Sequence, residues 1–220
     1  MKPGLPSPPV ILDNMVLVMF VDSGMAALLP ALARGRVFVS PSILDATETA
    51  NSCDPVSEFM KGLARFTRLD DVLSRGRLEY RQAFLQSLAG QWEAVTPTLE
   101  ELRLANELTK KETRERARLL HPELRLARVD PGGAEAAAIA ISRGWTLWTD
   151  DNGTLPLIRT LYPEVTIERT CALVARAINE GLLNWVEGYA LFETTFKGQL
   201  DLHTVATLVW EQGEARCVIH

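Results

Sequence analysis

The 220-residue sequence lacks the features of membrane proteins and of cysteine-rich metal proteins. Its longest apolar run near the start, MVLVMFV at 15–21, is far shorter than the roughly 20 residues of a membrane span, and it has no signal-peptide cleavage pattern. The three cysteines, Cys53, Cys171 and Cys217, show no metal-ligand spacing, so reduced thiols are expected. We therefore expect a soluble, cytoplasmic protein without a membrane partner.

Positive charge and histidine are also scarce. The 23 Lys and Arg residues are outnumbered by 28 Asp and Glu, and the net charge of −5 argues against binding nucleic acid through general positive charge. The segment 103–128 is an exception, with eight Lys or Arg against four Glu. It is interpreted either as a solvated helix face or as a phosphate-contacting one. The candidate substrate contacts in it are Lys110, Lys111, Arg114 and Arg118. The three histidines share no ligand spacing.

The order of apolar segments predicts an α/β fold. A continuous apolar run at 15–21 indicates a buried strand, followed by a helix over 25–34 and a second strand at 37–39. Pro41 or Ser42 then opens another helix. Such a β-α-β-α start is typical of a parallel sheet that is covered on both faces.

The remainder of the chain continues this alternation after a long helical insertion. We expect a flexible tail at 1–9 and a single domain at 10–220, with the insertion at about 54–128. One of its helices would begin at Pro97. Later helices are expected at 134–143, 155–161 and 171–180, strands at 145–149 and 165–167, and C-terminal helices at about 184–212. The prediction is a parallel-sheet α/β/α sandwich with additional helices.

Carboxylates follow the predicted strands at several places. The string GWTLWTDDNG places Asp150 and Asp151 directly after an apolar strand, and Asp22 follows the run at 15–21. Glu48 lies on the helix after the second strand, and Glu135 lies in the Ala-rich string GGAEAAAIA. In a parallel sheet, ligands collect beyond the carboxyl ends of the strands. We therefore expect these acids to meet at one edge.

A cluster of carboxylates needs a counter-charge. Two like charges at about 5 Å repel by roughly 3 kcal/mol at an effective dielectric constant near 20. Mg²⁺ or Mn²⁺ relieves such repulsion and prefers oxygen ligands, and metals held in this way promote phosphodiester hydrolysis. Each acid also has a simpler interpretation, because Asp22 and either aspartate of the pair could cap helices, while Glu135 could favour a helix dipole.

Four strings of the sequence together resemble the PIN-domain proteins. They are VLVMFVDSG, SPSILDATE, GGAEAAAIAISRGWTLWTDDNG and TIERTCALVARAINEGLL, and the resemblance covers about 12–52 and 130–185. It implies a PIN-type fold with a Mg²⁺ or Mn²⁺ site made of Asp22, Glu48, Glu135 and Asp151, with Asp150 as the partner of Asp151. Ser23 and Thr170 match substrate-side positions. The chain departs from the family pattern at Gly133, where the family has Glu, and in ERTCALV, which lacks two glycines.

The resemblance implies a metal-dependent endoribonuclease related to the VapC-type toxins. RNA would be its substrate, with an antitoxin, another protein or a second copy of the chain as partner. The alternative is a catalytically silent PIN-like module that docks proteins through its helical middle. A third hypothesis is phosphotransfer with Asp22 as nucleophile, although VDSG lacks the second Asp that such motifs carry.

Overall fold

The computed structural model describes residues 8–44, 79, 81–84, 92–196 and 206–219. In this part of the chain, five parallel strands form one sheet in the order β3-β2-β1-β4-β5. The strands are β1 (Val10–Leu12), β2 (Val37–Val39), β3 (Trp92–Ala94), β4 (Thr146–Trp148) and β5 (Ile167–Glu168). The predicted α/β class with a parallel sheet is confirmed.

Alternate side chains of the strands point into two separate cores. Val10, Leu12 and Trp148 enter one apolar cluster, whereas Ile11 and Leu147 enter the other. This alternation follows from the period of two along a strand, and apolar residues at nearly every position are expected where both faces of a sheet are covered.

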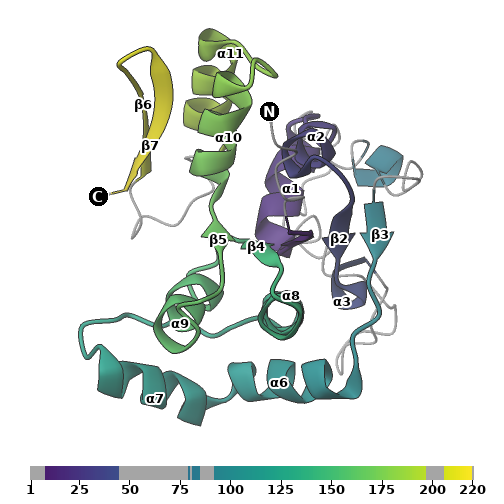
Figure 1. Cartoon of the computed structure of the whole chain (residues 1–220), viewed down its shortest axis with the longest axis vertical. Helices are drawn as coiled ribbons and strands as arrows, with labels where there is room; N and C mark the ends of the chain where they lie inside the picture. The colour runs from purple at the N-terminus through teal and green to yellow at the C-terminus, as the bar shows by residue number, and fades with distance from the viewer. Residues whose placement is uncertain (1–7, 45–78, 80, 85–91, 197–205, 220) are drawn as a thin grey trace, which may run out of the picture.

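Helices cover both faces of the sheet (Figure 1). The first core contains α1 (Asn14–Asp22), α2 (Leu28–Ala33) and α10 (Thr170–Asn179). The second contains α6 (Leu99–Thr109), α8 (Pro131–Arg143) and α9 (Thr154–Leu161), and α7 (Lys111–Leu120) runs on from α6. Further helices of the described residues are α3 (Pro41–Leu44), α11 (Trp185–Ala190) and the π-helical segment η1 (Leu191–Phe196).

The run predicted as the first strand is helix α1. The strand is the shorter segment Val10–Leu12 before it, which pairs with both β2 and β4. A continuous apolar run has no period that separates a buried strand from a buried helix. Asp13, at the N-cap position with extended backbone, marks the start of the helix. Asp22 therefore lies at the end of a helix and not, as predicted, at the end of a strand.

The middle of the chain is less helical than predicted. Within its described part, β3 and the non-helical residues 121–130 interrupt the helices. The helix expected from Pro97 begins instead at Leu99, because Thr98 is its N-cap and forms a capping box with Glu101. The predicted acid Glu48 lies outside the described residues.

The elements from α8 to α10 follow the prediction closely. Gly144 ends α8 in the left-handed conformation (φ 65°), which glycine adopts without steric cost. Gly132 and Gly133 lie inside the first turn of α8, however, and do not interrupt the chain. The order strand, helix, strand, helix over 146–179 is confirmed.

The C-terminal segment is a hairpin, and the helix predicted up to residue 212 is wrong. Strands β6 (Ala206–Glu211) and β7 (Glu214–Ile219) pair in an antiparallel manner across Gln212-Gly213, both with positive φ. Cys217 on β7 forms a disulfide with Cys171 on α10, so the expectation of three reduced thiols is also wrong. Their Cα atoms are 5.6 Å apart.

No helix of the described residues is long and apolar enough to cross a membrane.

Candidate functional site at the carboxyl edge of the sheet

The strand order defines where a ligand would bind. From β1 the chain proceeds to β2 and β3 on one side, whereas β4 leads to β5 on the other. Neighbouring strands β1 and β4 therefore form the topological switch point, and ligands of open α/β sheets bind in the crevice beyond it. Asp13 follows β1, and Asp150 and Asp151 follow β4 after Thr149.

Asp13 occupies the position that the sequence prediction gave to Asp22. Its backbone N–H donates to the carbonyl of Trp148 at 3.0 Å, extending the β1–β4 pairing by one residue. Its buried carboxylate accepts a 2.5 Å hydrogen bond from the hydroxyl of Thr149. Sequence reasoning missed Asp13 because it placed the strand too late. The signal was present in VILDN, where Asp-Asn follows three β-branched or aliphatic residues.

Asp22 is held in a buried ion pair. Nε and Nη2 of Arg81 donate to its two carboxylate oxygens at 2.6 and 2.7 Å. The side chains are only 2% and 3% exposed, for Asp22 and Arg81 respectively. Such a bidentate pair neutralises the carboxylate. A phosphotransfer nucleophile must be accessible, so this burial counts against the third hypothesis. The hydroxyl of Ser23 donates to the carbonyl of Phe20 at 3.0 Å and closes the end of α1.

Asp151 links the acidic edge to the start of α9. Its backbone N–H donates to the Thr149 hydroxyl oxygen at 3.1 Å, so Thr149 connects Asp151 to Asp13. One oxygen of its carboxylate accepts from the backbone N–H groups of Gly153 at 3.0 Å and Thr154 at 2.6 Å. Asp151 therefore satisfies donors at the start of α9.

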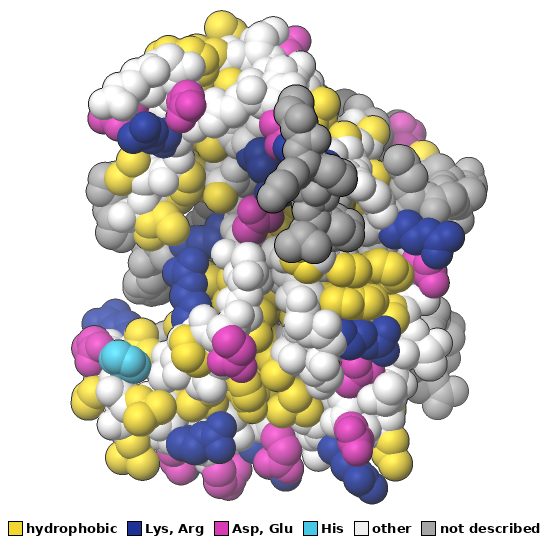
Figure 2. Space-filling model, in the orientation of Figure 1, with side chains coloured by type: hydrophobic (Ala, Val, Ile, Leu, Met, Phe, Trp, Pro, Cys, Tyr) yellow, Lys and Arg dark blue, Asp and Glu magenta, His cyan; other side chains and the backbone are white. Residues whose placement is uncertain are grey.

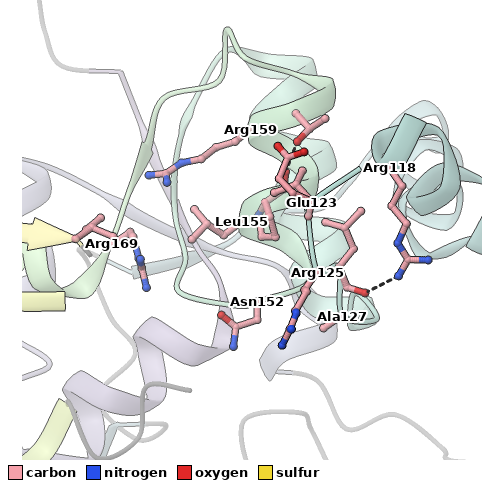
Figure 3. A pocket seen from close by; sticks show the side chains of 13 residues that line it. Arg118, Glu123, Arg125, Ala127, Asn152, Leu155, Arg159 and Arg169 are labelled. Carbon is pink, nitrogen blue, oxygen red and sulfur yellow. Dashed lines mark hydrogen bonds between the residues drawn. The ribbon is translucent and has the colours of Figure 1, made fainter. Parts of the chain in front are cut away.

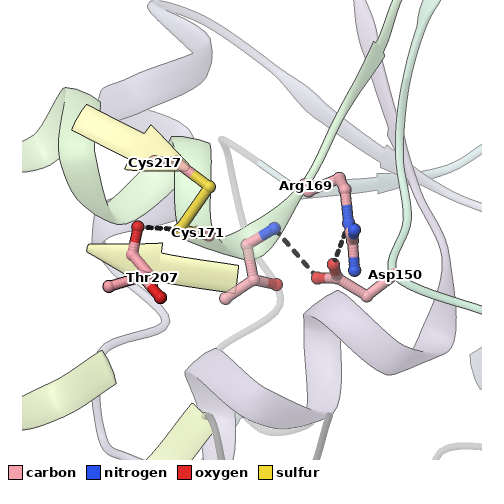
Figure 4. The surroundings of a disulfide bond; sticks show 6 residues. Asp150, Arg169, Cys171, Thr207 and Cys217 are labelled. Carbon is pink, nitrogen blue, oxygen red and sulfur yellow. Dashed lines mark hydrogen bonds and ion pairs between the residues drawn. A yellow bond between two sulfur atoms is a disulfide. The ribbon is translucent and has the colours of Figure 1, made fainter. Parts of the chain in front are cut away.

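Asp150 faces away from this edge. It is buried against Arg169, whose Nε donates to it at 2.8 Å, and it accepts from the backbone N–H of Thr170 at 2.9 Å (Figure 4). These contacts fix the start of α10. Thr170, predicted as a substrate contact, is itself fully buried.

A pocket of about 160 Å³ lies at the switch point. We call it the acidic pocket, because Asp13, Asp130 and Asp151 line it. Arg81 also lines it and carries Asp22 as its ion-pair partner, so Asp22 adjoins the pocket. Asp130, at the N-cap position of α8, was not predicted as a site residue. The string VDPGG contains the Asp-Pro start signal that could have identified it as a cap.

The other predicted acids are not gathered at this pocket. Glu135 lies buried on α8 and is not among the residues that line the pocket, and Glu48 lies outside the described residues. Among the described side chains, no three His, Cys, Asp or Glu groups are close enough together to hold a metal ion. The predicted four-carboxylate cluster is therefore not formed by the residues that the structure describes.

The acidic pocket nevertheless has the chemistry for a hydrated ion. Mg²⁺ usually keeps several waters and is bound through one or two carboxylates. A Cβ atom at Gly133 would lie 3.5 and 3.7 Å from the Asp13 oxygens and 2.7 Å from Oγ1 of Thr154. Glycine at position 133 thus permits the close approach of α8 to Thr154 and Asp13. The buried Thr154 hydroxyl has no hydrogen-bond partner within the described part of the chain. The carboxylate oxygens of Asp13 and Asp151, which line the pocket, are ligands of the kind that Mg²⁺ and Mn²⁺ prefer.

The predicted substrate-contacting residues of the middle segment lie around the junction of α6 and α7. Lys110 pairs with Glu107, Lys111 pairs with Glu115 at 3.2 Å, and a guanidinium N–H of Arg114 donates to the Thr109 carbonyl at 2.9 Å. None of the three lines the acidic pocket. Arg118 lines a second, larger pocket on the other side of the 150–153 turn.

No protein-family profile and no curated protein sequence matches the chain. Among solved structures, it matches a chain of the VapBC2 complex from Rickettsia felis, which is bound to a DNA fragment from its promoter. The two chains are 15% identical, and the match covers 73% of this chain and 97% of that one with a TM-score of 0.43. A similarity of this degree carries no information about activity or partners.

Proposed function

We propose that the chain is a metal-dependent phosphodiesterase of PIN-like type that cleaves RNA at the acidic pocket. One observation carries the proposal. The carboxylates that follow β1 and β4, Asp13 and Asp151, line the same pocket at the switch point of the parallel sheet. The resemblance of the four sequence strings to PIN domains supports the same function.

Asp13 and Asp151 are the residues that would hold Mg²⁺ or Mn²⁺. If these residues held such an ion, it would supply an activated water and a counter-charge for the phosphodiester. Thr149 orients both acids, because its hydroxyl donates to Asp13 and accepts from the Asp151 backbone. Asp130 lines the same pocket and is our candidate for accepting the proton of the attacking water.

We assign positioning roles to Asp22, which the sequence predicted as a metal ligand, and to Asp150, which it predicted as the catalytic partner of Asp151. Asp22 fixes Arg81 against the pocket, and Asp150 fixes Arg169 and the start of α10. Glu48 and Glu135 stay predictions as further ligands, since neither lies among the residues that line the acidic pocket.

The biological setting also stays a proposal. A toxin of the VapC kind would cut RNA inside a cell and would be silenced by an antitoxin that covers the acidic pocket. A homodimer is a second assembly that the family resemblance implies. Only the family resemblance implies these partners, and the chemistry of the acidic pocket requires none of them.

A silent protein-interaction module is the second candidate. Its support is that arginines neutralise both Asp22 and Asp150, while glycine stands at position 133, where the family pattern has a glutamate. With fewer free carboxylates than an active nuclease needs, the fold would serve only as a scaffold for binding.

Cleavage of a labelled single-stranded RNA in Mn²⁺ or Mg²⁺ separates the two candidates. The comparison is between the parent, Asp13→Asn and Asp151→Asn, purified in the same way, with circular dichroism as the check on folding. The proposal predicts metal-dependent cleavage that falls by at least about 100-fold in each variant. Cleavage that persists in both variants would come from another site or a contaminant, and would remove the proposal.

A further inference from the structure

A large cavity in the described part of the chain is rich in arginine. It has a volume of about 910 Å³ and lies between α9, the 121–130 segment and the end of β7 (Figure 3). We call it the arginine pocket, because four arginines line it: Arg118, Arg125, Arg159 and Arg169. Glu123 is the one acidic residue among those that line it, so four positive groups and one negative group give the lining a formal charge of +3. In Figure 2, Lys and Arg side chains gather in a recess on the left of the molecule.

Arg169 lines this pocket and has one unsatisfied donor. Its side chain is 3% exposed, and Nε is occupied by Asp150. Its Nη1 atom is buried and has no hydrogen-bond partner within the described residues. An unpaired donor on a buried cation is costly, and a negatively charged oxygen atom in the pocket would satisfy it.

Arg159 is a second cation without a counter-charge of its own. Burial, and then the charge of Arg169, lower the pKa of Arg159 below its ordinary value, and Asp150 offsets only part of this. Within the described part of the chain, Arg125 and Arg159 form no ion pair with a carboxylate. In Figure 3 the guanidinium groups of Arg159 and Arg169 extend to the same side of the pocket, beyond Leu155.

The pocket also offers an apolar surface. Leu126, Leu155 and Pro156 line it beside the arginines, and Asn152 adds an amide from the turn that carries Asp151. Its volume lies in the range of small-molecule sites. Guanidinium groups match phosphate oxygens in pairs, and they also stack on flat rings. A ligand with a phosphate and an apolar flat body combines both features.

We propose that the arginine pocket binds a nucleotide through its phosphate, with Arg159 and Arg169 as the phosphate contacts and Arg125 as a further cation of the pocket wall. The nucleotide comes either from an RNA strand or from a free mononucleotide, which share this chemistry. The inference stands apart from catalysis, since the acidic pocket lies on the other side of the 150–153 turn and has its own residues.

Binding is tested in EDTA, where metal-dependent cleavage is silent. The probes are a short fluorescein-labelled single-stranded RNA, followed by anisotropy, and uridine 5′-monophosphate as competitor, with uridine as the control without phosphate. We expect Arg125→Gln and Arg159→Gln to weaken RNA binding at least about tenfold each. The slope of log affinity against log salt should fall by about 0.7 for each contact removed.

Arg103→Gln is the matched control. Arg103 is an exposed arginine of α6 and lines neither pocket, so the substitution makes the same charge change elsewhere. It should alter affinity by less than about twofold. Arg159→Lys keeps the charge without the planar guanidinium group. Its affinity for RNA should lie between that of the parent and that of Arg159→Gln, which separates phosphate recognition from a folding defect.

The outcomes are distinct. Competition by uridine 5′-monophosphate but not by uridine identifies a free nucleotide as sufficient, whereas binding of RNA alone identifies strand phosphates. Absence of binding by both probes, or an equal loss in Arg103→Gln, overturns the proposal. RNA binding that persists in a protein without cleavage activity would remove the proposed function and leave this inference standing.

Discussion

The turn at 150–153 separates two pockets of opposite character. On one side Asp151 faces the acidic pocket with Asp13 and Asp130, and on the other Asn152 faces the arginine pocket. Between them, Asp150 is buried against Arg169. One short turn after β4 therefore supplies an acid for the proposed chemistry, an acid for structure and an amide for the proposed ligand.

The comparison shows that adjacent carboxylates can have unrelated roles. Asp150 and Asp151 are adjacent residues of the same type. Asp150 is enclosed by an arginine and a backbone N–H, whereas Asp151 caps a helix at a pocket. Their roles are set by the β5–α10 junction, which brings Arg169 to one of them. The predictions below test this division, in order of expected effect.

Asp150→Asn should cause the largest loss of stability. It removes the charge that balances the buried guanidinium of Arg169, so the free energy of unfolding should fall by roughly 3–5 kcal/mol. Asp151→Asn should cost less than about 1 kcal/mol, because asparagine caps helices as well as aspartate. Urea unfolding of the two variants measures the difference, and equal losses would contradict the division of roles between these residues.

Removal of the disulfide should cause the second-largest loss of stability. Cys171 follows Thr170, whose N–H holds Asp150, and its Sγ lies 3.9 Å from the Thr207 carbonyl oxygen (Figure 4). The bond closes a separation of 46 residues, and Cys217→Ser should lower the free energy of unfolding by about 2–4 kcal/mol. Thiol titration of the denatured, unreduced protein should detect one thiol, three cysteines minus the bonded pair. Detection of three thiols would show that the pair is reduced.

Gly133→Ala tests the close approach of α8 to Thr154 beside Asp13. The added Cβ would lie 2.7 Å from Oγ1 of Thr154, and overpacking of this kind costs about 1–3 kcal/mol. Adding Thr154→Ala removes the clashing atom, so thermal unfolding of the double variant should recover most of the loss. If the double variant is no more stable than Gly133→Ala, the clash is not the cause.

The smallest effect is expected at an ion pair remote from both pockets. Hydrogen bonding from Arg143 lowers the pKa of Glu101 from its usual 4.5, against the opposing effect of burial. The charged form is therefore favoured by folding, so its contribution is present above pH 4.5 and is lost as the pH falls through the lower, folded value.

Glu101→Gln should therefore flatten the acid limb of the stability profile. Because the Arg143 side chain is 26% exposed, its loss of a partner should cost only about 1 kcal/mol at neutral pH. Glutamine also preserves the capping box with Thr98. A loss as large as that of Asp150→Asn would mean that burial does not govern the cost of breaking an ion pair in this protein.

The sequence correctly predicted the parts of the fold in which turn residues lie on both sides of an apolar segment. The strand of Trp145–Thr149, the helix ended by Gly144 and the strand Val37–Val39 were identified in this way. It failed where an apolar run carried no period, so α1 was taken for a strand. It failed again at Ala206–Glu211, where alternating burial of a strand was interpreted as an amphipathic helix.

The candidate site was predicted in part for the same reason. Asp151 follows a correctly identified strand and lines the acidic pocket, whereas the error over α1 put Asp22 in the place of Asp13. Asp150 and Asp22 could not be separated from the pocket acids by sequence alone. Their partners, Arg169 and Arg81, are 19 and 59 residues away along the chain and meet them only in the fold.

Binding of Mn²⁺ to the parent and to Asp13→Asn is the decisive measurement for a metal site at the β1–β4 switch point. Calorimetric titration at up to millimolar Mn²⁺, with unfolding curves to confirm that asparagine preserves the fold, measures uptake without a substrate. We expect saturable binding of Mn²⁺ by the parent and the loss of this binding in Asp13→Asn. Equal uptake by both proteins, or none by the parent, would contradict a metal site at the β1–β4 switch point.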